Sequence, residues 1–137
     1  MILGVGSDLC VIARVEKMVK KYRERFINRL FHQYEIAYSE RHKKRAIARY
    51  SMLFAAKEAA SKALGTGMLR HQITWRSFEV QHHETGQPWL KFHGSANHHL
   101  HRLCPHNFIP QASLSLSDDG GMAHAMVVIW ALSKSNA

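Results

Sequence analysis

Residues 54–67 read Phe54-Ala-Ala-Lys57-Glu58-Ala-Ala-Ser61-Lys62-Ala-Leu-Gly65-Thr66-Gly67, and this stretch decides the fold of the 137-residue chain. It closes a longer segment, residues 45–64, that contains no glycine or proline and is rich in alanine. Such a composition predicts the longest helix of the chain. Gly65 and Gly67 come directly after it, and glycine is favoured just past a helix C-terminus. The small alanine side chains would let another element or a ligand approach this helix closely.

The residues before this helix predict one strand and three further helical segments. Residues 2–9 are apolar and spaced by glycines, which favours a buried strand that ends near Asp8. Residues 11–23 repeat apolar side chains at helical spacing among lysines and arginines, which predicts an amphipathic helix with a basic outer face. Residues 26–31 predict a short turn or helix, and residues 33–41 predict another helix.

The residues after the long helix change to a strand pattern. Residues 73–75, 78–80 and 89–92 are typical of short strands, with a turn at 84–88 and a short helix at 95–103. Residues 112–117 and 123–132 flank Asp118-Asp119-Gly120-Gly121, which is a strong hairpin signal. Helices early and antiparallel strands late predict an α+β domain over residues 1–137, with a small antiparallel sheet packed against one long and several short helices.

Composition limits the classes of partner. The net charge is +9, and most of the 19 Lys and Arg residues lie between Arg14 and Arg49, so a folded basic face is expected. Such a face attracts nucleic acid, anionic membranes, phosphorylated metabolites or acidic proteins. No apolar run reaches the roughly 20 residues of a membrane span. No signal peptide is visible, and Cys10 and Cys104 are expected to be free thiols, so the prediction is a cytoplasmic protein without membrane contact.

Two carboxylates are the candidates for chemistry. Glu58 and Lys62 are four residues apart and share a helix face, where an ordinary exposed ion pair is the simple alternative. Glu58 is, however, the only acidic residue between Glu40 and Glu79. Asp8 has its own simple alternative as a helix N-cap. If the fold brings Asp8 and Glu58 together, two carboxylates with phosphate oxygens make a site suited to Mg²⁺.

These residues closely resemble the holo-[acyl-carrier-protein] synthase family of 4′-phosphopantetheinyl transferases. The resemblance starts at Gly6-Ser-Asp8 with Arg14 six residues on, and its most specific part is the stretch Phe54 to Gly67. It continues through Trp75, Phe78-Glu79-Val80, Gly86-Gln-Pro88, Ser115-Leu-Ser117 and residues 123–128, and so spans nearly the whole chain in order.

The resemblance implies transfer of 4′-phosphopantetheine from coenzyme A to a serine of apo-acyl carrier protein in fatty acid biosynthesis, with release of adenosine 3′,5′-bisphosphate. Asp8 and Glu58 would bind Mg²⁺, and Lys62 would stabilise charge on the phosphates. The base for the serine proton is either Glu58 or a water on the metal. The remaining coenzyme A contacts that it implies are Gly65, Thr66, Pro88, Arg45 and Arg49.

The same resemblance gives the basic face a partner and predicts an assembly. Acyl carrier proteins are small and acidic, so cationic side chains of the first helices would steer docking beside two apolar contacts. The residues are Arg14, Lys21, Arg25 and Arg29, with Met18 and Phe26 as the apolar pair. The family also implies a homotrimer with coenzyme A bound between neighbouring subunits.

The chain departs from the family pattern at two positions, and three alternative functions are considered. Leu53 stands where the family usually has arginine, and Asp118 stands where histidine is common, so both affect expected phosphate contacts. A nucleic-acid-binding module is the main alternative function, although no signature for one is present and no nucleic acid partner is expected. A homologue that binds carrier protein without catalysis is a second alternative. A metal site in the histidine-rich segments is a third, and no role is assigned to His82, His83, His98, His99 and His101.

Overall fold

The computed structural model describes residues 1–137 and confirms the α+β class. The helices are α1 (Ile12–Tyr22), α2 (Glu24–Leu30), α3 (Gln33–Glu40), α4 (Ala46–Leu64) and α5 (Gly94–Leu103). The strands are β1 (Ile2–Val11), β2 (Phe78–His82), β3 (Pro88–Phe92), β4 (Phe108–Asp119) and β5 (Met122–Ser133). Single 3₁₀ turns occupy Lys43–Arg45, Trp75–Ser77 and Lys134–Asn136. None of the helices combines the length and the apolar character needed to cross a membrane.

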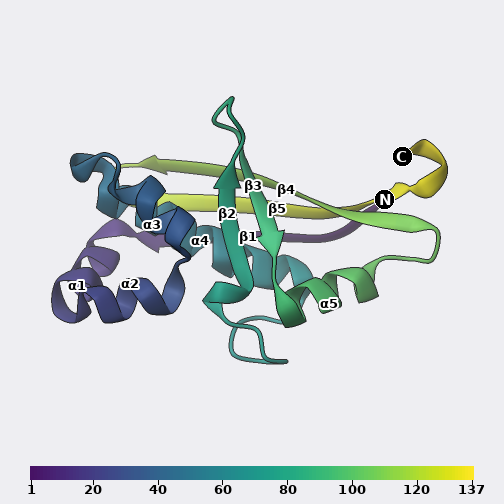
Figure 1. The fold of residues 1–137 in the computed structure, drawn as a ribbon, viewed down its shortest axis with the longest axis horizontal. Coiled ribbons are helices and arrows are strands. Elements are labelled where there is room, and N and C mark those ends of the chain that lie inside the picture. Colours follow the sequence, from purple (N-terminus) through teal and green to yellow (C-terminus); the bar gives the residue numbers. More distant parts are fainter.

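The strands form two separate antiparallel groups. The long strands make a three-stranded sheet in the order β1-β5-β4, and β2 pairs only with β3. In Figure 1 the β2–β3 hairpin runs steeply across the three long strands. The β4–β5 hairpin pairs Asp119 with Met122, so Gly120 and Gly121 form a two-residue turn. Both glycines have positive φ, as the tight hairpin turn favoured by right-twisted strands requires. The predicted hairpin is confirmed.

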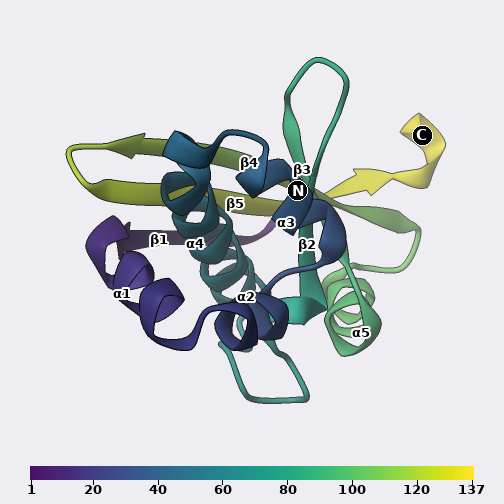
Figure 2. The same ribbon diagram turned by 60° about the vertical axis from the view of Figure 1, so that its left-hand side comes forward.

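Helix α4 crosses one face of the three-stranded sheet at very close range (Figure 2). A Cβ atom added at Gly6 would overlap the carbonyl oxygen of Ala59. One added at Gly4 would overlap the carbonyl oxygen of Ala63. Because alternate residues of a strand share a face, Asp8 points to the same side as these two glycines. The glycines let the two backbones touch, and this contact places the Asp8 carboxylate along the flank of α4.

The variant Gly6→Ala is therefore expected to lower the free energy of unfolding by about 1–3 kcal/mol, because its methyl group overpacks the strand–helix contact. Urea denaturation measures the change. Ser7→Ala is the matched control, since Ser7 is exposed and alternates to the other face of β1. Equal midpoints for Gly6→Ala and the natural chain would contradict this account of the close contact.

One predicted strand is wrong. Residues 73–75 do not pair with any strand; instead Ile73 is buried in the core and Trp75 begins a 3₁₀ turn. The turn is stabilised by the Ser77 hydroxyl, which accepts a hydrogen bond from the backbone N–H of Thr74 at 2.9 Å. An apolar β-branched and aromatic run is typical of strands, but here this local hydrogen bond competes with pairing. The other predicted elements are present, with β1, β4 and β5 longer than expected. However, β1 is not the buried strand that its apolar run predicts, because it lies at an edge of the sheet and leaves Val5 and Leu9 exposed.

The outer face of the three-stranded sheet has no helix over it. Helix α4 covers the inner face, where Ala123, Ala125, Val127 and Ile129 of β5 are buried. On the outer face, apolar side chains stay in contact with solvent. Their exposed fractions are 54% for Val5, 66% for Leu9 and 43% for Met126. We call these three residues the outer apolar face.

Candidate functional site

The structure brings Asp8, Glu58 and Lys62 together where the end of β1 meets α4. The Lys62 Nζ donates to the Asp8 carboxylate at 3.1 Å and to the carbonyl oxygen of Ser7 at 3.0 Å. Glu58 stands one turn before Lys62 on the same flank of the helix. Lys62 is half exposed, whereas Asp8 is largely sheltered. Asp8 of β1 therefore lies beside Glu58 and Lys62 of α4 within one chain, as predicted.

The two carboxylates also act on a common neighbour. The pKa of the Cys10 thiol is raised to about 11, mainly by burial and also by the negative charges of Asp8 and Glu58, while Arg14 opposes the shift. Because the charges of both carboxylates affect the pKa of this one thiol, Asp8 and Glu58 both lie near Cys10. With so high a pKa, Cys10 stays protonated at neutral pH and acts as an apolar side chain rather than a nucleophile.

Trp75 fixes the orientation of Glu58. Its indole N–H donates to the Glu58 Oε1 at 3.0 Å, which leaves the second carboxylate oxygen without a protein donor. Trp75 lies in the 3₁₀ turn before β2, so this part of the chain orients a side chain in the middle of α4. Trp75 belongs to the family motif, but the sequence alone suggests no role for it. Only the fold shows that its N–H reaches Glu58.

The residues present at this junction fit a magnesium ion. Mg²⁺ prefers oxygen ligands and is usually held by one or two carboxylates, with waters and substrate phosphates filling the other positions. Asp8 and Glu58 supply two such carboxylates, and the neighbouring Lys62 is a cation suited to phosphate. The nearest sulfur, in Cys10, is held as the thiol, so the donor set that faces the site is oxygen.

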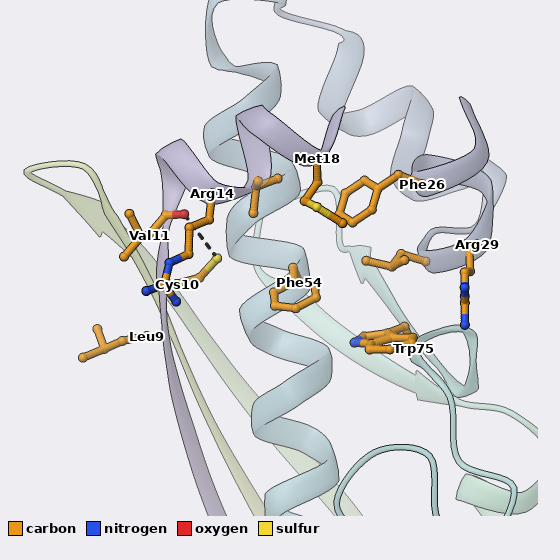
Figure 3. A pocket seen from close by; sticks show the side chains of 11 residues that line it. Leu9, Cys10, Val11, Arg14, Met18, Phe26, Arg29, Phe54 and Trp75 are labelled. Atoms are coloured by element: carbon orange, nitrogen blue, oxygen red, sulfur yellow. Dashed lines mark hydrogen bonds between the residues drawn. The ribbon is translucent and has the colours of Figure 1, made fainter. Parts of the chain in front are cut away.

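An apolar cavity of about 490 Å³ opens beside this junction, between α1, α2 and α4 (Figure 3). Phe54 and Trp75 line the side toward the acidic pair, whereas Met18 and Phe26 line the side toward the first two helices. Arg14 and Arg29 are exposed and also line the cavity. Lys21 and Arg25 are exposed on the same two helices. The six predicted carrier-protein residues thus lie on α1 and α2, and four of them (Arg14, Met18, Phe26 and Arg29) line the cavity beside the carboxylates.

A second group of predicted ligands gathers on the other flank of α4. Both terminal nitrogens of the Arg45 guanidinium group donate to the Asp118 carboxylate, at 2.9 and 2.8 Å. These hydrogen bonds hold the pKa of Asp118 below its usual value. Arg49 donates to the carbonyl oxygen of Tyr38 at 2.7 Å and stacks over that ring. Leu53 is buried in the core, so no cation occupies that position.

Pro88 lies with this second group. Together with Tyr38, Met52 and Leu116 it lines a cavity of about 290 Å³ that shares no residue with the larger one. The sheet register explains the separation, because Asp8 of β1 and Leu116 of β4 both pair with Ala125 of the central strand. Two strand spacings, roughly 10 Å in all, separate the two edges. Helix α4 lies between them.

The C-terminal end of α4 has the backbone that the glycines predict. Gly65 adopts a left-handed conformation with φ of 81° and ends the helix. The Thr66 side chain is buried and donates to the carbonyl oxygen of Gly67 at 3.0 Å, which holds this turn in place. Gly65 is exposed, and no atom lies within 4 Å of where its Cβ would be. A ligand can therefore approach the backbone here.

Comparison with known proteins gives a consistent result. Residues 4–131 match the model of the 4′-phosphopantetheinyl transferase superfamily. The chain is 43% identical over 139 aligned positions to a holo-[acyl-carrier-protein] synthase of Nitrobacter hamburgensis, and the alignment covers 99% of each chain.

Solved structures of the same class have the same fold. The crystal structure of the holo-[acyl-carrier-protein] synthase from Neisseria meningitidis matches with a TM-score of 0.81 and 28% identity, over 95% of this chain and 99% of that one. The Helicobacter pylori holo-[acyl-carrier-protein] synthase in complex with coenzyme A matches with a TM-score of 0.76 and 28% identity, over 92% and 99% of the two chains.

Proposed function

This chain belongs to the 4′-phosphopantetheinyl transferase superfamily, and from that premise we propose how its residues carry out the reaction. It is an enzyme that transfers the 4′-phosphopantetheine group from coenzyme A to a serine of apo-acyl carrier protein in fatty acid biosynthesis. The observation that carries the proposal is the junction of Asp8, Glu58 and Lys62 beside an apolar cavity. We expect residues 1–137 to act as one cytoplasmic domain.

Each residue of the junction has a physical task. Asp8 and Glu58 would hold Mg²⁺, which when bound neutralises charge on the pyrophosphate of coenzyme A. Lys62 lies beside Asp8, where its ammonium group can stabilise negative charge that grows on the phosphate oxygens. The exposed backbone at Gly65 would give the phosphates close access to the end of the helix, next to Thr66.

The bond changes then follow. The carrier serine oxygen forms a bond to the β-phosphorus of coenzyme A, and the bond from that phosphorus to the bridging oxygen of adenosine 3′,5′-bisphosphate breaks. The serine proton passes either to Glu58 or to a water at the metal site. Trp75 keeps one Glu58 oxygen engaged, so the other oxygen is the one available to the reaction.

The carrier protein is proposed to dock on α1 and α2. Their exposed cations would attract an acidic partner, and the cavity between Met18 and Phe26 can accept an apolar side chain.

Arg14→Ala is expected to raise the KM for carrier protein by roughly tenfold while kcat stays within about twofold, since one charged contact is worth about 1.5 kcal/mol. Initial rates at varied carrier concentration measure this. Lys134→Ala is the control, because Lys134 is exposed near the C-terminus; a fall in kcat alone would contradict the docking role.

A homotrimer would complete the site. Arg45, Arg49 and Pro88 lie on the opposite flank of α4 from Asp8 and Lys62, so one chain presents two half-sites rather than one cleft. If copies pack so that the second half-site of one chain faces the acidic pair of the next, coenzyme A can contact both. The outer apolar face supplies unburied surface for such packing.

Val5→Glu together with Met126→Glu is therefore expected to convert the assembly to monomers and to lower activity at least tenfold, because two carboxylates cannot be buried unpaired. Light scattering coupled to gel filtration gives the mass, and the transfer assay gives the rate. Leu69→Glu is the matched control, since Leu69 is 65% exposed but lies in the loop after α4. A monomeric natural chain with full activity would overturn the assembly.

Mass spectrometry tests the function itself. Purified enzyme, apo-carrier protein, coenzyme A and Mg²⁺ should yield carrier protein heavier by one phosphopantetheine group. Omission of Mg²⁺ with added chelator should stop the gain. An unchanged carrier mass, together with salt-sensitive binding to RNA of mixed sequence, would instead favour the nucleic-acid alternative.

A further inference from the structure

Two histidines and a glutamate meet between α3, β2 and α5. His32 is the N-cap residue of α3, Glu79 lies in β2, and His93 is the N-cap residue of α5. One ligand atom from each side chain lies within 4.8 Å of the others. None of the three belongs to the junction of Asp8 and Glu58 or lines its cavity. We call these residues the His–Glu–His cluster.

A single oxygen of Glu79 faces both rings. Its Oε1 accepts a hydrogen bond from the His93 Nε2–H at 2.8 Å, a proton that a bound metal ion would replace, and lies 3.8 Å from the His32 Nδ1. Its Oε2 is engaged separately, because the Gln81 side-chain amide donates to it at 3.0 Å. Glu79 is only 7% exposed, so this carboxylate is oriented inside the protein rather than left in solvent. Ligand carboxylates in metal sites are commonly held by such an outer hydrogen bond.

The orientation of His32 leaves one ring nitrogen available. Its Nε2 lies 2.8 Å from the carbonyl oxygen of Arg76, which can only accept a hydrogen bond, so Nε2 carries the proton. The lone pair is then on Nδ1, the nitrogen that faces Glu79. A backbone carbonyl that fixes the tautomer of a histidine is the usual partner of a metal-ligating imidazole. The two imidazole rings stack with their centres 4.7 Å apart.

The spacing of the ligand atoms fits a transition metal. Tetrahedral Zn²⁺ with bonds of about 2.0–2.1 Å separates its ligand atoms by roughly 3.3 Å. The two distances to the Glu79 oxygen, 2.8 and 3.8 Å, lie on either side of that value. Rotations of two imidazole rings that are partly exposed, His32 by 19% and His93 by 34%, can equalise them. The same exposure gives an ion a path from solvent.

We propose that the His–Glu–His cluster binds one first-row divalent transition metal of the Zn²⁺ class, with water as the fourth ligand. Two imidazoles and a carboxylate suit zinc, whereas Mg²⁺ prefers oxygen ligands only. The cluster is therefore chemically distinct from the acidic pair. A bound ion would join the starts of two helices to β2, and its role is to hold these elements together rather than to take part in transfer.

Zinc binding to the full-length enzyme tests the proposal. Protein stripped with chelator is dialysed against limiting Zn²⁺ in a large excess of Mg²⁺, and bound metal is measured by plasma mass spectrometry. We expect one zinc per chain and a higher Tm in the zinc-loaded protein. Co²⁺ in place of Zn²⁺ should give the visible absorption bands of a tetrahedral site, which report the ligands directly.

The variants His32→Asn and His93→Asn remove one ligand each and keep a residue suited to an N-cap. Each should weaken zinc binding by more than about 100-fold, beyond the roughly 10–100-fold loss that removal of an outer partner causes. Gln81→Ala should give that smaller loss while leaving all three ligands in place. His98→Asn is the matched control on the exposed side of α5 and should bind zinc normally.

Glu58→Gln separates the two sites, because it alters only the acidic pair. Zinc binding that survives Glu58→Gln and is lost in His32→Asn and His93→Asn supports the cluster. Absence of zinc binding by the natural chain would overturn the proposal. So would equal binding by the histidine variants, or zinc that disappears with Glu58→Gln.

Discussion

Glu58→Gln is expected to lower kcat by about 10³-fold or more, since a lost interaction worth roughly 4 kcal/mol in the transition state corresponds to that factor. The substitution changes charge but hardly changes shape. A glutamine carbonyl oxygen can still accept the hydrogen bond that Trp75 donates at 3.0 Å. The loss should therefore come from the missing negative charge, not from a displaced side chain. The carrier-mass assay at saturating coenzyme A gives kcat.

The dependence on Mg²⁺ makes the result specific. If Glu58 is a ligand, the variant should also need a higher Mg²⁺ concentration to reach half its maximal rate. Glu16→Gln is the control, because Glu16 pairs with Lys20 on the surface of α1 at 2.8 Å and has no part in the junction. Normal kcat in Glu58→Gln would show that this carboxylate neither holds the metal nor accepts the serine proton.

Lys57→Met is expected to destabilise the fold by about 3–5 kcal/mol, the usual result of leaving one member of a buried ion pair alone. Lys57 has no exposed surface, and its Nζ donates to Glu35 at 2.8 Å. It also donates to the carbonyl oxygens of Trp75 at 3.1 Å and Phe78 at 2.6 Å. Burial lowers the pKa of Lys57, and Glu35 beside it opposes this shift. Methionine fills a similar volume but leaves two carbonyl groups without this donor and the Glu35 charge without its cation, although the backbone N–H groups of His32 and Val80 still donate to Glu35.

Urea denaturation of three variants checks this expectation. The double variant Lys57→Met with Glu35→Gln should recover part of the lost stability, because no unpaired charge stays in the core. Lys62→Met is the matched control for a lysine on the same helix, and it should change stability by less than about 1 kcal/mol because Lys62 is half exposed. A Lys57→Met protein as stable as the natural chain would refute the role of the pair.

Patterns within short stretches predicted most of the fold. The alanine-rich run before Gly65 marked α4, and Asp118-Asp119-Gly120-Gly121 marked the β4–β5 hairpin, because both signals are local. The prediction of a strand at residues 73–75 was wrong because the structure of this segment depends on contacts that are distant in sequence. The Thr74–Ser77 hydrogen bond and the burial of Ile73 depend on how this segment packs below α4, which no pattern of apolar residues records.

The site could be predicted only in part. Their motif singled out Asp8, Glu58 and Lys62 as candidates, and the fold brings them together. The partner of Arg45 was missed because Asp118 lies 73 residues further along the chain. Lys57 was also missed as a structural residue. Its place among so many surface cations gives no hint that its side chain is fully buried.

The position of α4 between the two half-sites has a genetic consequence. Since each working site of the proposed trimer draws its acidic pair from one copy and its arginines from another, a chain disabled at Glu58 and a chain disabled at Arg45 carry complementary defects. Expressed together in one cell, they would form mixed trimers in which an intact acidic pair can meet intact arginines. Two alleles that each fail alone would then rescue growth when combined.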